Sequence, residues 1–219
     1  FYTAIAKYSG ILISLIITGV LARLISPDKF GIVAVVTVIT FFFSIFSDLG
    51  IGAAIIQNKE LQQKDLNQLF SFTVWSGCIL TLLFFLCSWP ISFFYKEPSM
   101  KTITQLLAIN LFFASANIVP NALLYKAKAF KFLAWRSLGV QVSGGIIAIL
   151  AALGGAGLYA LIINPILSSI LLFIISYQKY PQTLEMTWGI PSIRKIFKFS
   201  AYQFIFNIIN YFSRNLDKL

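Results

Sequence analysis

The sequence is poor in charged residues and contains no histidine. Only 11% of its 219 residues are Asp, Glu, Lys or Arg, whereas about a quarter of the residues of an ordinary soluble domain are charged. So few charges could not cover the surface of a soluble globule, and this excludes a soluble domain. The absence of histidine also removes the most common general base and metal ligand.

Catalytic and metal-binding motifs are missing from the sequence as well. The two cysteines, Cys78 and Cys87, lie in one apolar segment, which favours buried thiols over a disulfide framework or a metal site. The sequence has no GxSxG nucleophile motif, no Walker loop and no pair of acidic residues on one helix face. We therefore expect no enzymatic activity, no catalytic residue, no metal and no cofactor.

What the sequence has instead is a series of long segments without a charged residue. A bilayer core of about 30 Å needs about 20 largely apolar residues in a helix. Strands of a membrane β-barrel would show short alternating segments, and these segments do not alternate. The sequence therefore predicts an all-α integral membrane protein. The segments are residues 8–22, 30–47, 66–95, 102–125, 137–178 and 199–213.

We expect about seven transmembrane helices. Residues 137–178 are too long for one helix, and glycines at 154, 155 and 157 favour a turn there. Residues 181–198 contain Trp188, Pro191 and several basic residues, which is typical of an interfacial helix. We expect a lobe of about six helices at 1–180, a linker at 181–198, and at 199–219 the first helix of a second lobe that this fragment truncates. The expected helices are 4–24, 30–46, 69–94, 102–125, 138–153, 158–177 and 199–212.

Basic residues lie mainly in the loops at the ends of these helices. The loops after the expected helices 30–46, 102–125 and 158–177 carry more Lys and Arg, Arg136 among them, than the loops on the opposite side. By the positive-inside rule the N-terminus is expected in the cytoplasm. The same distribution argues against nucleic-acid binding despite the net charge of +10.

Polar residues recur at steps of three and four in several expected helices, which places each set on one helix face. Small and polar residues also mediate helix packing, and this explanation stays open for Lys7, Gly10, Ser14 and Thr18. Three carboxamides on one face exceed what packing requires, and they suit a cavity for a hydroxyl-rich ligand because carboxamides both donate and accept hydrogen bonds. The carboxamides are Asn110, Asn117 and Asn121 in 102–125, and Gln203, Asn207 and Asn210 in 199–212.

Ionisable residues at the ends of the expected helices are further candidates for substrate binding. A charge close to the hydrocarbon is costly and often functional, although long side chains can extend to the interface. Arg23, Asp48 and Arg214 are the candidates, with Asp217 one turn beyond Arg214. A structural role at the end of helix 30–46 competes for Asp48.

Four segments, in order along the chain, resemble bacterial polysaccharide flippases. They are residues 21–31 (LARLISPDKFG), 46–57 (FSDLGIGAAIIQ), 120–125 (PNALLY) followed by Phe130 and Lys131, and 214–219 (RNLDKL). The family is that of Wzx-type polysaccharide or lipopolysaccharide flippases, within the multidrug/oligosaccharidyl-lipid/polysaccharide exporter superfamily.

This resemblance implies a MATE-like transporter lobe in the bacterial inner membrane. It implies flipping of a lipid-linked oligosaccharide or polysaccharide precursor by alternating access, with membrane lipids and other polysaccharide-assembly proteins as partners. The carboxamides would contact sugar hydroxyls, and Lys7, Arg23 or Arg214 would offset the diphosphate charge.

Three alternatives remain open at this point. A cation-coupled multidrug exporter of the same superfamily would need a carboxylate midway along a helix, and no expected helix has one. A membrane polysaccharide polymerase or acyltransferase would need catalytic residues in a large external loop or buried in the membrane. A scaffold without transport activity is the third alternative.

Overall fold

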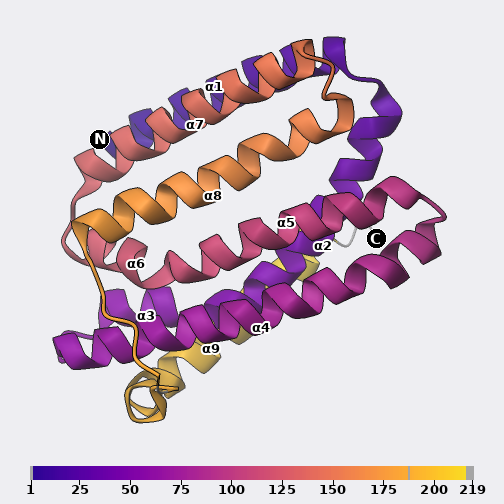
Figure 1. Cartoon of the computed structure of the whole chain (residues 1–219). Coiled ribbons are helices and arrows are strands. Elements are labelled where there is room, and N and C mark those ends of the chain that lie inside the picture. The colour runs from indigo at the N-terminus through magenta and orange to yellow at the C-terminus, as the bar shows by residue number, and fades with distance from the viewer. Residues whose placement is uncertain (1, 187, 216–219) are drawn as a thin grey trace.

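The computed structural model describes residues 2–186 and 188–215, and the side chains of these residues apart from 2–5, 212, 214 and 215. In that part of the chain the regular structure is helical throughout (Figure 1). The helices are α1 (Tyr2–Leu24), α2 (Pro27–Asp48), α3 (Ile51–Gln57), α4 (Gln63–Tyr95), α5 (Pro98–Ala116), α6 (Ile118–Lys126), α7 (Phe130–Leu153), the short 3₁₀ helix η1 (Gly157–Tyr159), α8 (Ala160–Lys179) and α9 (Ile190–Asn215).

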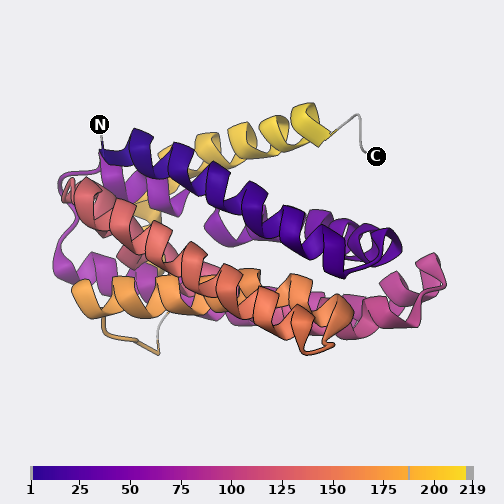
Figure 2. The ribbon, with the colours of Figure 1, turned by 90° about the horizontal axis from the view of Figure 1, so that it is seen from above.

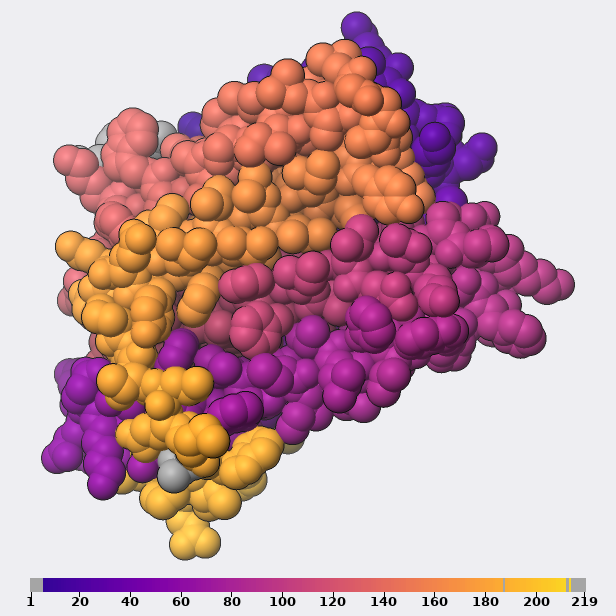
Figure 3. Space-filling view, viewed as in Figure 1, coloured from indigo at the N-terminus to yellow at the C-terminus, as the bar shows by residue number. Residues whose placement is uncertain are grey.

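The long helices form two layers. In Figure 1, α7, α8, α5 and α4 lie side by side in this order, and each packs against the next. In the space-filling view of that face their side chains form adjoining bands (Figure 3). On the other side, α1 packs mainly on α7, α2 packs on α5 and α4, and α9 contacts α2, α3 and α4 (Figure 2). The second layer therefore consists of α1, α2 and α9.

Proline and glycine set several of the helix ends. Pro27 and Pro98 open α2 and α5, where the missing N–H is not needed and the fixed φ suits a helix. The predicted break near residue 155 is confirmed, because α7 ends at Leu153 and Gly155 adopts φ +84°. The short turn that follows lets α8 run back along α7.

The expected helix 102–125 is two helices in the structure. The α5 helix ends at Ala116, α6 begins at Ile118, and their axes differ in direction by 41°. Pro120 lies in the first turn of α6, where a residue without an N–H is tolerated, whereas in the middle of a continuous helix it would remove a hydrogen bond. The single long helix expected here is therefore corrected to a broken one.

The number of candidate membrane helices is also corrected. Among the described residues, α1, α2, α4, α7 and α8 are long and apolar enough to cross a bilayer, and the broken pair α5–α6 makes a sixth. The seventh expected helix belongs to α9, which begins at Ile190 inside the segment expected as a linker. It runs on without interruption, and its basic residues Arg194, Lys195 and Lys198 lower its hydropathy.

Three apolar clusters hold the helices together. One joins α3, α4 and α6 and includes Ile196 of α9. A second joins α2, α4, α5 and α8 around Phe84, and a third joins α1, α7 and α8 around Ile17. Large apolar side chains such as Leu82 and Leu150 are exposed on the outer faces. The predicted fold class is confirmed: the chain is an all-α, multi-pass membrane protein.

The corner between α2 and α3 makes a close contact that can be tested by mutation. Gly50 adopts φ +73°, and a Cβ at this position would lie 2.6 Å from the Ser200 carbonyl oxygen and 2.8 Å from Gln203 Cβ. We expect Gly50→Ala to lower the thermal unfolding midpoint of the purified full-length protein. The left-handed backbone costs an alanine about 1–2 kcal/mol, and overpacking against α9 adds roughly 1–3 kcal/mol.

Gly155→Ala is the matched control for this variant. Gly155 also has a left-handed φ, +84°, but a Cβ there would have no neighbour within 4 Å. It should therefore show the backbone cost alone. Equal shifts in the two variants would contradict a close contact between the α2–α3 corner and α9.

Candidate functional site

Four pockets adjoin one another through shared lining residues, and we call them together the polar groove. The pocket between α2 and α9 shares Asp48 with the pocket between α2, α3 and α6. The latter shares Tyr125 with a pocket between α1, α6 and α7, which in turn shares Ser14 with a pocket between α1, α2 and α8. The polar residues that line the groove are Lys7, Ser14, Thr18, Ser44, Asp48, Asn121, Tyr125, Ser137, Gln141, Asn164, Asn207, Asn210 and Tyr211.

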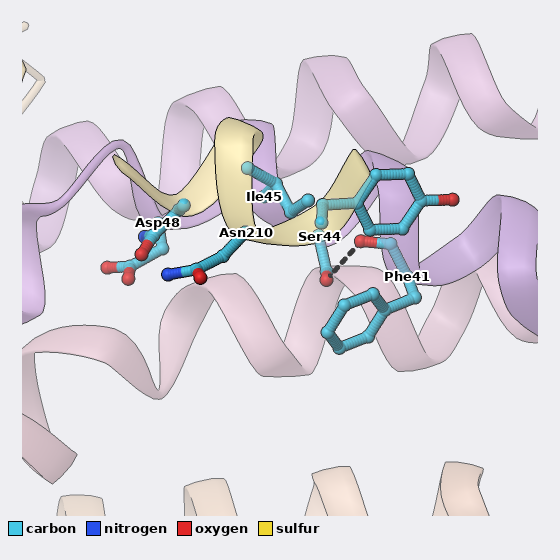
Figure 4. Close-up of a pocket in the computed structure, with 7 residues that line it drawn as sticks. Phe41, Ser44, Ile45, Asp48 and Asn210 are labelled. Atoms are coloured by element: carbon cyan, nitrogen blue, oxygen red, sulfur yellow. Dashed lines mark hydrogen bonds between the residues drawn. The ribbon is translucent and has the colours of Figure 1, made fainter. Parts of the chain in front are cut away.

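The end of the groove between α2 and α9 encloses about 400 Å³. Ser44 and Asp48 are one turn apart on α2, and Asn207 and Asn210 face them from α9. The Ser44 hydroxyl donates a hydrogen bond to the Phe41 carbonyl at 2.6 Å. Figure 4 shows the Asp48 carboxylate next to the Asn210 carboxamide. This end therefore offers one carboxylate and two carboxamides to a ligand.

Local hydrogen bonds orient two of these side chains. Asp48 Oδ1 accepts a hydrogen bond from the Gly52 amide at 3.2 Å, across the corner between α2 and α3. Gln203 Nε2 donates to Asn207 Oδ1 at 3.0 Å along one face of α9. Asn207 thus keeps its Nδ2 donor for the groove, because its oxygen is already engaged.

The position of α9 beside α2 is set by a cluster at the first turn of α4. Lys195 Nζ lies 2.7 Å from Asp65 Oδ1, and the Ser192 hydroxyl donates to the same oxygen at 2.7 Å. The Gln62 amide donates to Asp65 Oδ2 at 3.1 Å. Asp65 is buried, so its charge is stabilised by hydrogen bonds as well as by the ion pair.

The α1 side of the groove is the largest of the four pockets, at about 580 Å³. Gln141 Nε2 donates to the Gly10 carbonyl at 2.8 Å and ties α7 to α1. Lys7 is exposed in this pocket, two turns before Ser14 on the same face of α1, with Gly10 and Ile11 between them. The polar stripe of residues 7–18 therefore serves both helix packing, through Gly10, and the groove, through Lys7 and Ser14.

Arg136, which the sequence predicts to lie in a loop, is part of a helix behind the groove. It belongs to the second turn of α7 and is only 9% exposed. Its Nη2 donates to Asn121 Oδ1 at 2.9 Å and its Nη1 donates to the Ser176 hydroxyl at 2.5 Å. Within the described residues no carboxylate forms an ion pair with it. The assignment of Arg136 to a loop is therefore wrong, and sequence reasoning missed a buried, uncompensated guanidinium.

The structure brings four of the candidate residues into the groove: Asp48, Asn121, Asn207 and Asn210. Gln203 is one step removed, since it bonds to Asn207.

Three other candidates, Asn110, Asn117 and Arg23, do not line these pockets. Asn110 lies on α5, and Asn117 lies at the α5–α6 break with its Oδ1 buried and unpartnered. Arg23 is exposed in the last turn of α1. The side chain of Arg214, and Asp217 as a whole, lie outside the residues that the structure describes.

Metal ligands do not gather in the described part of the chain, where no three His, Cys, Asp or Glu residues are grouped as an ion would require. Cys78 and Cys87 are free thiols. The chemistry available in the groove is therefore hydrogen bonding and charge.

Comparison with known proteins shows the family to which the chain belongs. The family model described as "Polysaccharide biosynthesis protein" matches residues 20–219. The chain is 25% identical, over its whole length, to 45% of the lipopolysaccharide biosynthesis protein WzxC of Escherichia coli. It is 26% identical, over 82% of its length, to 38% of the teichuronic acid biosynthesis protein TuaB of Bacillus subtilis.

A third relative is the succinoglycan biosynthesis transport protein ExoT of Rhizobium meliloti, which is 21% identical over 77% of this chain and 34% of its own length. The chain thus spans less than half of the length of these relatives. No solved structure matches it. Since the family model covers nearly all of the sequence, the chain belongs to the polysaccharide biosynthesis protein family.

Proposed function

We propose that the protein moves a lipid-linked oligosaccharide or polysaccharide precursor across the bacterial inner membrane by alternating access, with the polar groove as part of the glycan path. The observation that carries the proposal is the succession of four adjoining pockets, lined by polar side chains, among the membrane helices. Polar side chains are costly in lipid and are kept there where they line a cavity or a transport path.

The residues of the groove fit a glycan. Carboxamides and hydroxyls can each donate and accept hydrogen bonds, as sugar hydroxyls do, and Asn207, Asn210, Gln141 and Ser14 are of these types. Lys7 supplies a positive charge that would attract a diphosphate. The lipid chain would remain in the bilayer beside the groove.

Alternating access would need a second lobe facing this one, in a MATE-like arrangement. The relatives named above are more than twice as long as this chain, which leaves room for such a lobe. The groove lies among the helices of the layer made by α1, α2 and α9, and this layer would face the partner lobe. The end that carries Lys59, Lys126 and Lys179 would lie in the cytoplasm, together with the N-terminus.

Water in the groove can be tested by thiol labelling in intact membranes. In full-length protein with Cys78 and Cys87 replaced by serine, Ser14→Cys and Asn207→Cys should react with a membrane-impermeant, charged maleimide, because a thiol needs water to ionise. Leu82→Cys is the control, since Leu82 is 60% exposed on the outer face of α4. It should react only after denaturation in detergent. Equal protection of all three thiols would contradict a hydrated groove.

Export of surface polysaccharide tests the function directly. In a strain that lacks the protein, the full-length gene should restore export, and Asn207→Leu combined with Asn210→Leu should not. Two lost hydrogen bonds cost about 2 kcal/mol of binding, or roughly thirtyfold in affinity. Asn110→Leu makes the same change on α5, outside the four pockets, and should still export when present at the same level in the membrane. Loss of export in Asn110→Leu but not in the double variant would contradict the groove.

A further inference from the structure

Only the NH₂ group of the Asn121 carboxamide is free to bind a ligand in the groove, because its oxygen accepts a hydrogen bond from Arg136. Asn121 lies on α6 in the pocket that it shares with Asp48 and Tyr125. A free carboxamide can turn either its oxygen or its NH₂ group outward, and thus act as acceptor or donor. Here the Oδ1 atom accepts a hydrogen bond from Arg136 at 2.9 Å. Because a guanidinium can only donate, this bond fixes the orientation, and the NH₂ group is left for the pocket.

The Nδ2 atom of Asn121 has no acceptor among the described residues, so this donor is available to a ligand. Arg136 is itself held from a third helix. Its Nη1 donates to the hydroxyl of Ser176 on α8, and that hydroxyl donates to the Leu172 carbonyl. The guanidinium is thus fixed between α6, α7 and α8 and cannot readily release Asn121.

Burial of Arg136 requires an explanation other than stability. Moving a charge from water into the protein interior has a large unfavourable desolvation free energy, and without a counter-ion little of it is offset. Arg136 is 9% exposed, it lacks an ion-pair partner in the described chain, and its Nε atom has no hydrogen-bond partner. An apolar side chain of similar volume would fill the site at lower cost. The hydrogen bond to Asn121 offers a functional reason for a charged side chain at this position.

We infer that Arg136 is a positioning residue that fixes Asn121 as a hydrogen-bond donor, so that this point of the groove recognises an acceptor oxygen of the substrate and not a donor. The inference rests on the proposed function, which supplies an oxygen-rich substrate. The positive charge behind the carboxamide polarises its NH₂ group and strengthens the bond that it donates.

Two single variants of the full-length protein separate positioning from a structural role. Arg136→Met removes the charge but keeps an apolar side chain of comparable length, and Asn121→Asp keeps an acceptor for Arg136 but removes the NH₂ donor. Both should lower polysaccharide export about tenfold or more at equal membrane levels, while the thermal unfolding midpoint stays unchanged or rises. A structural role would predict a lowered midpoint with Arg136→Met.

A double variant shows whether Arg136 acts through Asn121. Arg136→Met combined with Asn121→Leu should export no worse than Asn121→Leu alone, because the effect of the arginine passes through the carboxamide. Additive losses would overturn the inference, as would unchanged export in Asn121→Asp or a lower midpoint in Arg136→Met. In those cases the proposed function stands, since the unaltered protein restores export. If the unaltered protein fails to restore export, the proposed function falls and this inference falls with it.

Discussion

The cost of placing polar groups in hydrocarbon governs the arrangement of this protein. Lipid offers no hydrogen bonds, so a polar side chain on a membrane helix is stabilised when it has a partner or faces a hydrated cavity. The inner faces of α1, α2, α6 and α9 carry such side chains, and they meet in one groove. The outer faces carry apolar side chains such as Leu82 and Leu150. The division between lipid face and groove follows from this single constraint.

The groove depends on contacts that lie outside it. The Asp65–Lys195 ion pair and the Ser192 hydroxyl dock the start of α9 on α4, and Gly50 allows α9 to approach the corner between α2 and α3. Together these contacts place Asn207 and Asn210 opposite Asp48. Arg136 acts from the other side, where it links α6 and α8. The shape of the polar groove is thus determined by a few buried polar contacts between helices.

The long uncharged segments of the sequence predict the membrane helices well, because length and apolarity are properties of a single segment. The turn near Gly155 and the alignment of the carboxamides of α9 on one helix face could also be predicted, because they too depend only on the local sequence. Pro120 indicates an interruption of the segment 102–125, because a proline cannot donate a helix hydrogen bond, but the direction of the bend could not be predicted. The burial of Arg136 could not be predicted either. Both depend on how α6, α7 and α8 pack, and an arginine close to a helix end has the same sequence signature whether it faces water or the protein interior. A helix could be expected near residues 190–198, but its continuity with the helix at 199–212 could not, because the basic residues there are typical of a separate helix at the membrane interface.

The most direct test is transport by the full-length protein in liposomes. A lipid-linked oligosaccharide carrying a fluorescent sugar would be placed in one leaflet, and its appearance in the other would be followed with a membrane-impermeant quencher. The labelled glycan should cross much faster in liposomes containing the protein than in protein-free liposomes of the same lipids. Equal rates in the two preparations would contradict transport of the glycan by this protein.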